Sequence, residues 1–294
     1  MTTKDRLILL YFIALILSPF KSISQEPYLN KNTFNILSWN IQMLPDFYAP
    51  FSSYLRKKQT KRLPEIISYI KKSDFDIIVL QEVFDVQMKK KLAKQLEKYY
   101  PYIQPPIKKG FGIKLSNGIM ILSKYPIEYE HHIRFVDTEG NDKMAQKGCV
   151  LITASIRDKE WLIAGTHLNS TSQEIRDLQY QQIKKEIISP YLSDSIPFIL
   201  AGDLNTTKNT SSYTKMMGEF KLICSDLNEK RPYTYDSHNS WNQPNYNVWI
   251  DYLLHNLNEE KILQHYIIRP TMNFKNNTMD LADHYGIALT IAID

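Results

Sequence analysis

The stretch Phe198-Ile-Leu-Ala-Gly-Asp-Leu-Asn205 decides the fold, because an apolar run ends abruptly here in polar groups. An apolar run followed by glycine predicts a buried strand that opens into a turn. Gly202 is expected to let the backbone bend and approach a ligand closely. Asp203 and Asn205 would then project from the end of a rigid element, as in a functional site. An Asx turn is the structural alternative for the same spacing.

Four other segments end in the same way. They are Leu37-Ser-Trp-Asn40, Leu80-Gln-Glu82, Gly165-Thr-His-Leu-Asn169 and Ala282-Asp-His284. Each places a carboxylate, an amide or an imidazole at or beside the end of an apolar run. Each would be a weak signal alone. Together with the first stretch they predict a hydrolytic site built on the ends of strands.

Apolar patterns elsewhere alternate between strand and helix. The predicted strands are Phe34–Gln42, Asp76–Leu80, Gly118–Ser123, Cys149–Ile156, Trp161–Thr166, Phe198–Ala201, Trp249–Leu254 and Gly286–Ile293. The predicted helices are Arg62–Lys72, Val86–Tyr99 and Ser172–Ile188. Two of the strands follow each other without a helix, which favours mixed sheets. We therefore predict an α/β fold in which two mixed β-sheets pack together and are covered by helices.

The N-terminus has the pattern of a secretory signal. Lys4 and Arg6 precede the apolar run Leu7–Leu17, and Ser22-Ile-Ser24 supplies small residues before an expected cleavage after Ser24. The run is shorter than the roughly 20 residues that span a bilayer, although an uncleaved anchor is the alternative. We expect residues 1–24 to be a signal peptide and residues 25–294 to form one domain of a secreted protein, extracellular or periplasmic.

Charge and cysteine content restrict the class of protein. The formal net charge is +5, and removal of residues 1–24 would leave +3. This mild basic balance suits a phosphate-bearing or membrane-surface substrate but is too small to indicate nucleic-acid binding. The two cysteines, Cys149 and Cys224, are a poor basis for a disulfide framework. Cys149 is expected to be a small buried hydrophobic residue.

Asn40 and Glu82 indicate a hard cation. Amide and carboxylate oxygens are ligands that Mg²⁺ accepts, with water and substrate phosphate completing its coordination. The sequence has no cluster of cysteine and histidine at zinc spacing. For Glu82 alone, a carboxylate that favours the dipole of the following helix is an equally good explanation.

Two histidines stand beside predicted strands. His167 ends one strand, and His284 follows Asp283 just before the last. A histidine paired with a carboxylate is a general base held in the right tautomer. Asp251 lies within an apolar strand, where an unpaired charge is costly to bury, so we expect it to pair with His284. The histidines expected to be structural or exposed are His131, His132, His238, His255 and His265.

This ordered set of polar residues resembles the endonuclease/exonuclease/phosphatase superfamily, and more closely the neutral sphingomyelinase family with its secreted bacterial sphingomyelinase C members. The resemblance runs from about Phe34 to Ile293. The motifs that carry it are Trp39-Asn-Ile-Gln-Met-Leu-Pro45, Gln81-Glu-Val-Phe84, Asn117-Gly118, Ser123-Lys-Tyr-Pro-Ile127, Lys147-Gly148, Gly165-Thr-His-Leu168, Pro232-Tyr-Thr234 and Asp251-Tyr252.

The resemblance implies a four-layer α/β sandwich that hydrolyses sphingomyelin to ceramide and phosphocholine. It implies Mg²⁺ as cofactor, with Mn²⁺ or Co²⁺ as substitutes. The implied metal site consists of Glu82, Asn40 and Asp283.

The resemblance also implies the catalytic roles. His284, oriented by Asp251, would activate a water molecule for in-line attack on phosphorus, and Asp203 would help to position that water. Asn205 and His167 would stabilise the phosphoryl oxygens as charge develops on them.

Substrate and partner expectations follow from the same family. Lys147 and Asn169 are the implied substrate contacts, and Asn169 stands where family members often carry glutamine. The implied partner is sphingomyelin in membranes or vesicles, reached by peripheral membrane contact by a monomer, with no nucleic acid. Secreted members often carry an aromatic hairpin for membrane insertion, but here the stretch Arg269–Met279 contains only Met272 and Phe274 in its place.

Two alternatives remain open at this point. One is another phosphodiesterase or phosphatase on the same scaffold, either a nuclease or a phosphoinositide phosphatase. The other is a non-catalytic lipid-binding module that retains the fold. A nuclease should have a more basic surface, and every catalytic side chain that the family requires is present.

Overall fold

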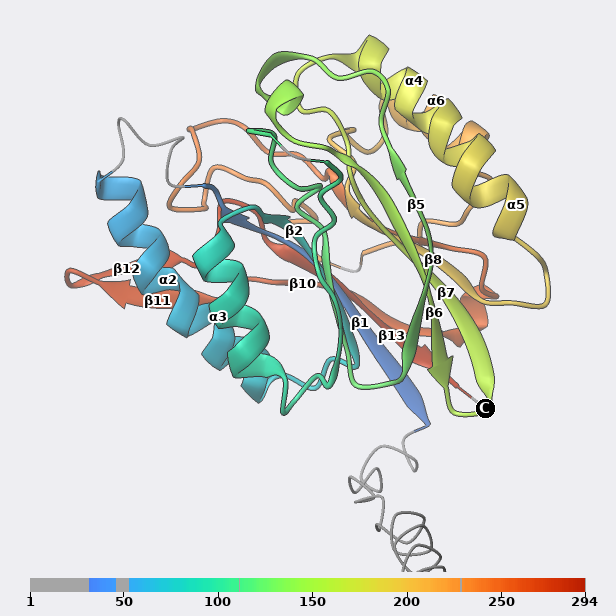
Figure 1. The fold of residues 1–294 in the computed structure, drawn as a ribbon, viewed down its shortest axis with the longest axis horizontal. Coiled ribbons are helices and arrows are strands. Elements are labelled where there is room, and N and C mark those ends of the chain that lie inside the picture. The colour runs from blue at the N-terminus through green and yellow to red at the C-terminus, as the bar shows by residue number, and fades with distance from the viewer. Residues whose placement is uncertain (1–31, 46–52, 111, 228, 294) are drawn as a thin grey trace, which may run out of the picture. The chain divides into compact units, whose positions relative to one another are not determined.

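The computed structural model of the chain describes residues 32–45, 53–110, 112–227 and 229–293. The expected signal peptide lies outside these ranges. The chain divides into two units, Met1–Asn32 and Thr33–Asp294, and the second contains all the named elements. Figure 1 shows this unit as strands between two groups of helices. None of the described helices is long and apolar enough to cross a membrane.

The first sheet has six strands. In spatial order they are β10 (Ile262–Ile268), β13 (Gly286–Ala292), β1 (Thr33–Met43), β2 (Ile77–Val83), β4 (Met120–Ser123) and β3 (Tyr102–Gln104). β1 and β2 run parallel, whereas all the other neighbours are antiparallel.

The second sheet has five strands. In spatial order they are β5 (Ile127–Arg134), β6 (Gly148–Ile156), β7 (Lys159–His167), β8 (Phe198–Asp203) and β9 (Asp251–His255). Here β7 and β8 are the parallel pair. Both sheets are therefore mixed, as the succession of strands without intervening helices predicted.

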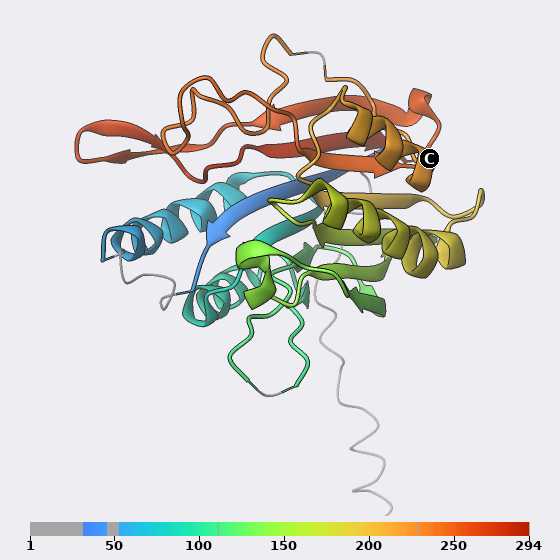
Figure 2. The ribbon, with the colours of Figure 1, turned by 90° about the horizontal axis from the view of Figure 1, so that it is seen from above.

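The two sheets pack face to face, and helices cover their outer faces (Figure 2). Alternate residues of β1 divide between two cores: Ile36 packs in the core between the sheets, and Leu37 and Trp39 face the helices. Helices α2 (Ser53–Lys72) and α3 (Val86–Leu96) lie against the first sheet. Helices α4 (Gln173–Ile183) and α6 (Ser211–Phe220) lie against the second, which completes the predicted four layers.

Element boundaries differ from the predictions where the apolar pattern is weak. Helix α2 begins at Ser53 instead of Arg62. The helix predicted to end at Ile188 is α4 followed by a π-helical turn. The short elements are this turn (Lys184–Ile188), the 3-10 helices Gly140–Met144 and Glu259–Lys261, and α5 (Ser189–Tyr191).

The stretch Arg269–Met279, which lacks the aromatic pair of a membrane-inserting hairpin, contains most of a small β-hairpin. It pairs β11 (Thr271–Phe274) with β12 (Asn277–Asp280). Its turn residues Lys275 and Asn276 both have positive φ, 48° and 64°. A hairpin is thus present, but its turn is formed by the polar residues Lys275 and Asn276.

The cysteines agree with the predicted role for Cys149. It is fully buried in the core between the sheets, and burial raises the pKa of its thiol. Cys224 is partly buried, and both are free cysteines.

Candidate active site

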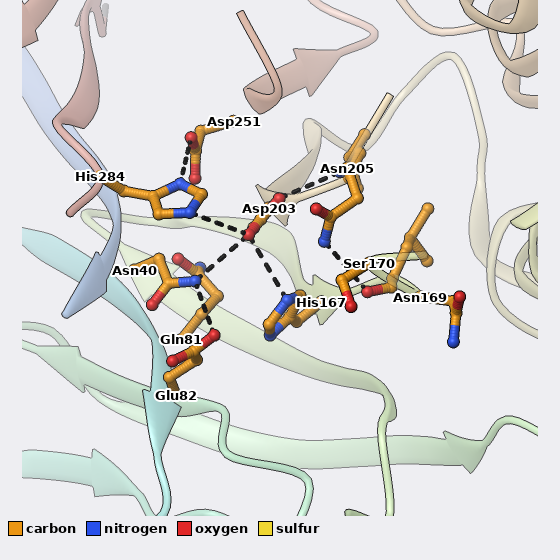
Figure 3. A network of polar contacts seen from close by, with 12 residues as sticks. Asn40, Gln81, Glu82, His167, Asn169, Ser170, Asp203, Asn205, Asp251 and His284 are labelled. Carbon is orange, nitrogen blue, oxygen red and sulfur yellow. Dashed lines mark hydrogen bonds and ion pairs between the residues drawn. The ribbon is translucent and has the colours of Figure 1, made fainter. Parts of the chain in front are cut away.

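Sheet topology brings the polar strand ends to one edge of the molecule. The parallel pairs β1/β2 and β7/β8 place their carboxyl ends at this edge, and the antiparallel β9 and β13 begin there. Figure 3 shows the resulting cluster. The first sheet contributes Asn40 and Glu82, and the segment before β13 contributes His284. The second sheet contributes His167, Asp203 and Asp251.

Strand register aligns the second-sheet members. His167 lies opposite Asp203, and Asp203 lies opposite Asp251, so the three side chains stand in a row on one face. A Cβ added to Gly202 would lie 2.0 Å from the carbonyl oxygen of Thr166. Gly202 therefore allows β7 and β8 to approach each other. The expected approach of the Gly202 backbone to a ligand stays a prediction.

The predicted pairing of His284 with Asp251 is confirmed. Nδ1 of His284 lies 2.9 Å from Oδ2 of Asp251, and both residues are buried. The backbone N–H of Asp251 donates in turn to Thr234 Oγ1 at 3.1 Å, which fixes the start of β9. Burial opposes protonation, but the carboxylates of Asp251 and Asp203 raise the pKa of His284 well above 6.5.

Asp203 lies at the centre of the network in Figure 3. Its Oδ2 accepts a hydrogen bond from Asn40 Nδ2 at 3.2 Å and is 3.4 Å from His167 Nε2 and 3.6 Å from His284 Nε2. Its Oδ1 accepts from the backbone N–H of Asn205 at 3.0 Å. Burial raises the pKa of Asp203 to about 6, against the opposing effect of His284.

Glu82 and Asp283 form the other acidic part of the site. Burial, followed by the nearby carboxylate of Asp283, raises the pKa of Glu82 to about 7. Asn40 Nδ2 donates to Glu82 Oε1 at 3.3 Å, and Gln42 Nε2 donates to Asp283 Oδ2 at 2.7 Å. Because Asn40 Oδ1 accepts from the backbone N–H of Gln42, its amide nitrogen faces the carboxylates.

These residues fit a divalent cation. Asp283 Oδ1 is buried, and no hydrogen-bond donor among the described residues reaches it. A cation between Glu82 and Asp283 would offset the cost of ionising these two half-buried carboxylates. Ligand atoms of Asp203, Asp251 and His284 also lie within 4.8 Å of one another. A metal bound there would compete with the His284–Asp251 hydrogen bond, so the first position is the better candidate.

Lys147 and His167 are two of the basic residues that line the pocket of the site. The Lys147 ammonium contacts His167 Nε2 at 3.0 Å, the carbonyl of Leu168 at 2.9 Å and Asp142 Oδ1 at 2.8 Å. Leu168 and Asp142 engage two of the ammonium hydrogens, and the role of the third depends on the tautomer of His167. Burial and the charge of Lys147 hold the pKa of His167 well below 6.5, which keeps the imidazole neutral at pH 7.

Asn169 has a structural role. Its side chain is fully buried, and Oδ1 accepts from the backbone N–H groups of Thr171 and Ser172. Its Nδ2 donates to the Glu139 carbonyl at 3.1 Å. The side chain thus organises the turn before α4, and this geometry does not support the expected contact with substrate.

A pocket of about 270 Å³ opens beside these groups. Glu82, Asp203 and His284 line one part of it, together with Asn205, which follows β8 in a left-handed conformation with φ 47°. Asn205 Nδ2 donates to the Leu168 carbonyl at 3.2 Å. A larger cavity of about 530 Å³ is lined by none of these residues.

Sequence reasoning missed a buried cation behind the acidic groups. Arg62 of α2 is fully buried; it donates to the carbonyl of Gln42 at 2.6 Å and to that of Leu281 at 2.8 Å. Its guanidinium lies 4.8 Å from the ring centre of Trp241. Burial lowers the pKa of Arg62 to about 10, although Asp283 opposes this shift. No pattern in the sequence separates Arg62 from the solvated basic residues around it.

Comparisons with known proteins agree with this architecture. The chain is 29% identical over 226 residues to Sphingomyelinase C 2 of Leptospira interrogans; the match covers 69% of this chain and 35% of that protein. The chain thus spans about a third of the length of that relative.

Solved structures share the fold. Sphingomyelinase C from Streptomyces griseocarneus matches with a TM-score of 0.73 at 22% identity, covering 89% of this chain and 100% of that chain. A beta toxin mutant from Staphylococcus aureus with bound magnesium ions matches with a TM-score of 0.73 at 22% identity, covering 90% of this chain and all of that one.

A family model spans most of the described part of the chain. It is the model of the Endonuclease/Exonuclease/phosphatase family, and it matches residues 37–276. The match includes the strand ends that carry Asn40, Glu82, His167, Asp203 and Asp251. This chain therefore belongs to the Endonuclease/Exonuclease/phosphatase family.

Proposed function

We propose that this chain is a secreted, Mg²⁺-dependent phosphodiesterase that hydrolyses sphingomyelin to ceramide and phosphocholine. The observation that carries the proposal is the buried His284–Asp251 pair, 2.9 Å apart, at a pocket that also contains Glu82 and Asp203. The names of the relatives support sphingomyelin as the substrate. The protein would act as a monomer in peripheral contact with the lipid surface.

The chemistry follows from the tautomer of His284. In neutral His284, with Nδ1–H donated to Asp251, the lone pair is on Nε2, on the side of Asp203. The carboxylates raise the pKa of His284 in the metal-free fold, and a divalent cation bound at Glu82 and Asp283 would oppose that shift and favour the neutral form. Nε2 takes a proton from a water molecule that Asp203 helps to orient. The water oxygen bonds to phosphorus, and the bond between phosphorus and the ceramide oxygen breaks. The released alkoxide takes up, through solvent, the proton that His284 gives back, which yields ceramide and restores neutral His284.

The remaining groups position the phosphate and stabilise its charge. Asn205 would donate a hydrogen bond to a phosphoryl oxygen, and His167 would contact another with its neutral imidazole. The charge of Lys147, held behind His167, favours the developing negative charge without direct contact.

Glu82 and Asp283 would hold the metal ion, and Asn40, which presents its amide nitrogen to Glu82, would orient that carboxylate. When bound, Mg²⁺ supplies electrostatic stabilisation of the phosphoryl oxygens. Mn²⁺ or Co²⁺ could take its place. Arg62 would fix Gln42, and through it Asp283, from behind.

One substrate panel tests the proposal. The purified protein is incubated with sphingomyelin vesicles, phosphatidylcholine vesicles and plasmid DNA, first with Mg²⁺ and then with excess chelator. We expect phosphocholine release from sphingomyelin that is lost with chelator. Nicking of DNA without lipid turnover would assign the chain to the nucleases. No hydrolysis of any of the three substrates would favour a lipid-binding module.

Two substitutions test the assigned roles. His284→Ala and Glu82→Ala should each leave the far-UV circular dichroism spectrum unchanged and reduce sphingomyelin turnover at least ~100-fold. His131→Ala, which changes a histidine of β5 outside the pocket, is the matched control and should retain activity. Near-normal turnover in either site variant would overturn its role.

A further inference from the structure

The loop between β3 and β4 carries basic and aliphatic side chains that the proposed hydrolysis does not use. The sequence from Pro105 to Ile119 contains three lysines, Lys108, Lys109 and Lys114, and no acidic residue. All three lysines are exposed. Ile113 is 87% exposed, which is the largest value for a large hydrophobic residue in the described part of the chain.

Strand register places this loop at the edge of the molecule that holds the active site. Leu80 of β2 lies opposite Met120 of β4, and Gln104 of β3 lies opposite Ile121. The loop therefore begins and ends beside the carboxyl end of β2, which carries Glu82. Figure 2 shows the described part of the loop, in green, projecting from the body of the sandwich.

Hydrogen bonds hold the loop against a second segment of the same character. The side chain of Gln146 exchanges two hydrogen bonds of 2.8 Å with the backbone of Lys109. The N–H of Leu115 donates to the carbonyl of Met144 at 2.8 Å, which brings the exposed pair Lys143-Met144 beside the loop. This segment continues into Lys147, which lines the pocket. The basic and aliphatic side chains thus gather next to the entrance of the site.

This combination of side chains favours a negatively charged bilayer as the partner. Each lysine close to an anionic lipid surface contributes about fivefold in affinity. An exposed isoleucine among lysines gains further by entering the boundary between headgroups and acyl chains. Nucleic acid would attract the same lysines through its phosphates, but it offers Ile113 no comparable apolar environment.

We propose that this edge docks on bilayers that contain anionic lipids, so that the enzyme prefers sphingomyelin in a negatively charged membrane. The docking surface consists of Lys108, Lys109, Ile113, Lys114, Lys143 and Met144. This inference rests on the proposed function and names the partner surface of that same site. The docking surface would supply membrane contact that the polar turn of the β11–β12 hairpin does not offer.

Vesicle co-sedimentation in chelator tests docking separately from hydrolysis. The full-length protein is titrated with vesicles of sphingomyelin and phosphatidylcholine, with and without phosphatidylserine. We expect phosphatidylserine to tighten binding at least ~10-fold and high salt to remove most of this gain. The double variant Lys109→Gln/Lys114→Gln should weaken binding to the anionic vesicles about 10- to 30-fold. Ile113→Ser should weaken it about 5- to 10-fold, and the loss should persist at high salt.

Matched controls carry the same changes elsewhere on the surface. Lys94→Gln/Lys98→Gln removes two charges from exposed positions at the end of α3 and after it. Leu263→Ser changes a residue of β10 that is 52% exposed. Both variants should bind vesicles like the wild type.

Three outcomes would decide against the proposals. Equal binding to vesicles with and without phosphatidylserine, or loop variants with wild-type affinity, would overturn the docking surface. Plasmid DNA binding that depends on Lys109 and Lys114, with vesicle binding unaffected by their substitution, would assign the surface to nucleic acid. Docking without hydrolysis of any phosphodiester in Mg²⁺ would reject the proposed reaction and leave the docking surface standing.

Discussion

His284 owes its assigned role to one hydrogen bond. Its partner Asp251 is fully buried, and the Asp251 backbone is fixed by Thr234. The carboxylate holds the proton on Nδ1 and leaves Nε2 to accept a proton at the pocket. In the proposed reaction the same carboxylate would also stabilise the imidazolium that forms when His284 takes a proton from water.

Asp251→Asn is therefore expected to lower kcat at least ~100-fold with little change in fold, because an amide can bind the wrong tautomer and carries no charge. The measurement is steady-state hydrolysis of sphingomyelin, with circular dichroism as the test of folding. Asp226→Asn serves as the control, since the Asp226 side chain is 98% exposed. A kcat within fivefold of the wild type would mean that Asp251 does not orient the base.

At the scale of elements, two pairs of parallel strands, β1/β2 and β7/β8, bring the site residues together. Each sheet contributes one such pair, and their carboxyl ends carry Asn40, Glu82, His167 and Asp203. The alignment within the second sheet depends on close contact between β7 and β8 at Gly202. This glycine thus supports the position of Asp203 through strand spacing.

Gly202→Ala should destabilise the fold by about 1–3 kcal/mol or more, because the added Cβ would lie 2.0 Å from a backbone oxygen that cannot swing aside. Urea denaturation measures the change. Gly218→Ala in α6 is the control, since a Cβ there meets nothing within 4 Å and alanine favours a helix. Wild-type stability in Gly202→Ala would show that the two strands separate easily.

Strand ends and their polar residues could be predicted because apolar runs and their sudden termination are visible in sequence. The backbone conformation of the site could not be predicted. Gln42, Glu82 and Asn205 all have positive φ, and no local sequence pattern predicts this conformation for residues other than glycine. The edge strand β5 was missed because much of it is exposed and polar. Arg62 was missed because burial of a guanidinium depends on tertiary partners from distant segments.

At the scale of the whole molecule, the site joins the two sheets. The hydrogen bond between Asn40 and Asp203 crosses from β1 to β8, and that between His284 and Asp251 crosses from the segment before β13 to β9. Buried carboxylates therefore meet where the two sheets meet. Without a cation their ionisation works against folding, so metal binding and stability should be linked.

The linkage has a defined pH dependence. Glu82 ionises with a pKa of about 7 in the metal-free fold and about 4.5 ordinarily, so this fold loses stability as pH rises from about 4.5 to 7. A cation bound by ionised Glu82 offsets that loss above pH 7. At 100 times its Kd, Mg²⁺ would add about 2.7 kcal/mol, or roughly 5 to 10 °C in Tm.

We accordingly expect a fixed millimolar concentration of Mg²⁺ to raise Tm by roughly 5 to 10 °C at pH 8 and by much less at pH 5.5, where a proton competes for Glu82. Differential scanning calorimetry with Mg²⁺ or chelator measures both shifts. Glu82→Gln removes the charge at nearly constant size, so it should raise the Tm of the metal-free protein at pH 8 and abolish the response to Mg²⁺. A response that survives in Glu82→Gln would place the cation elsewhere, with Asp203, Asp251 and His284 as the alternative group.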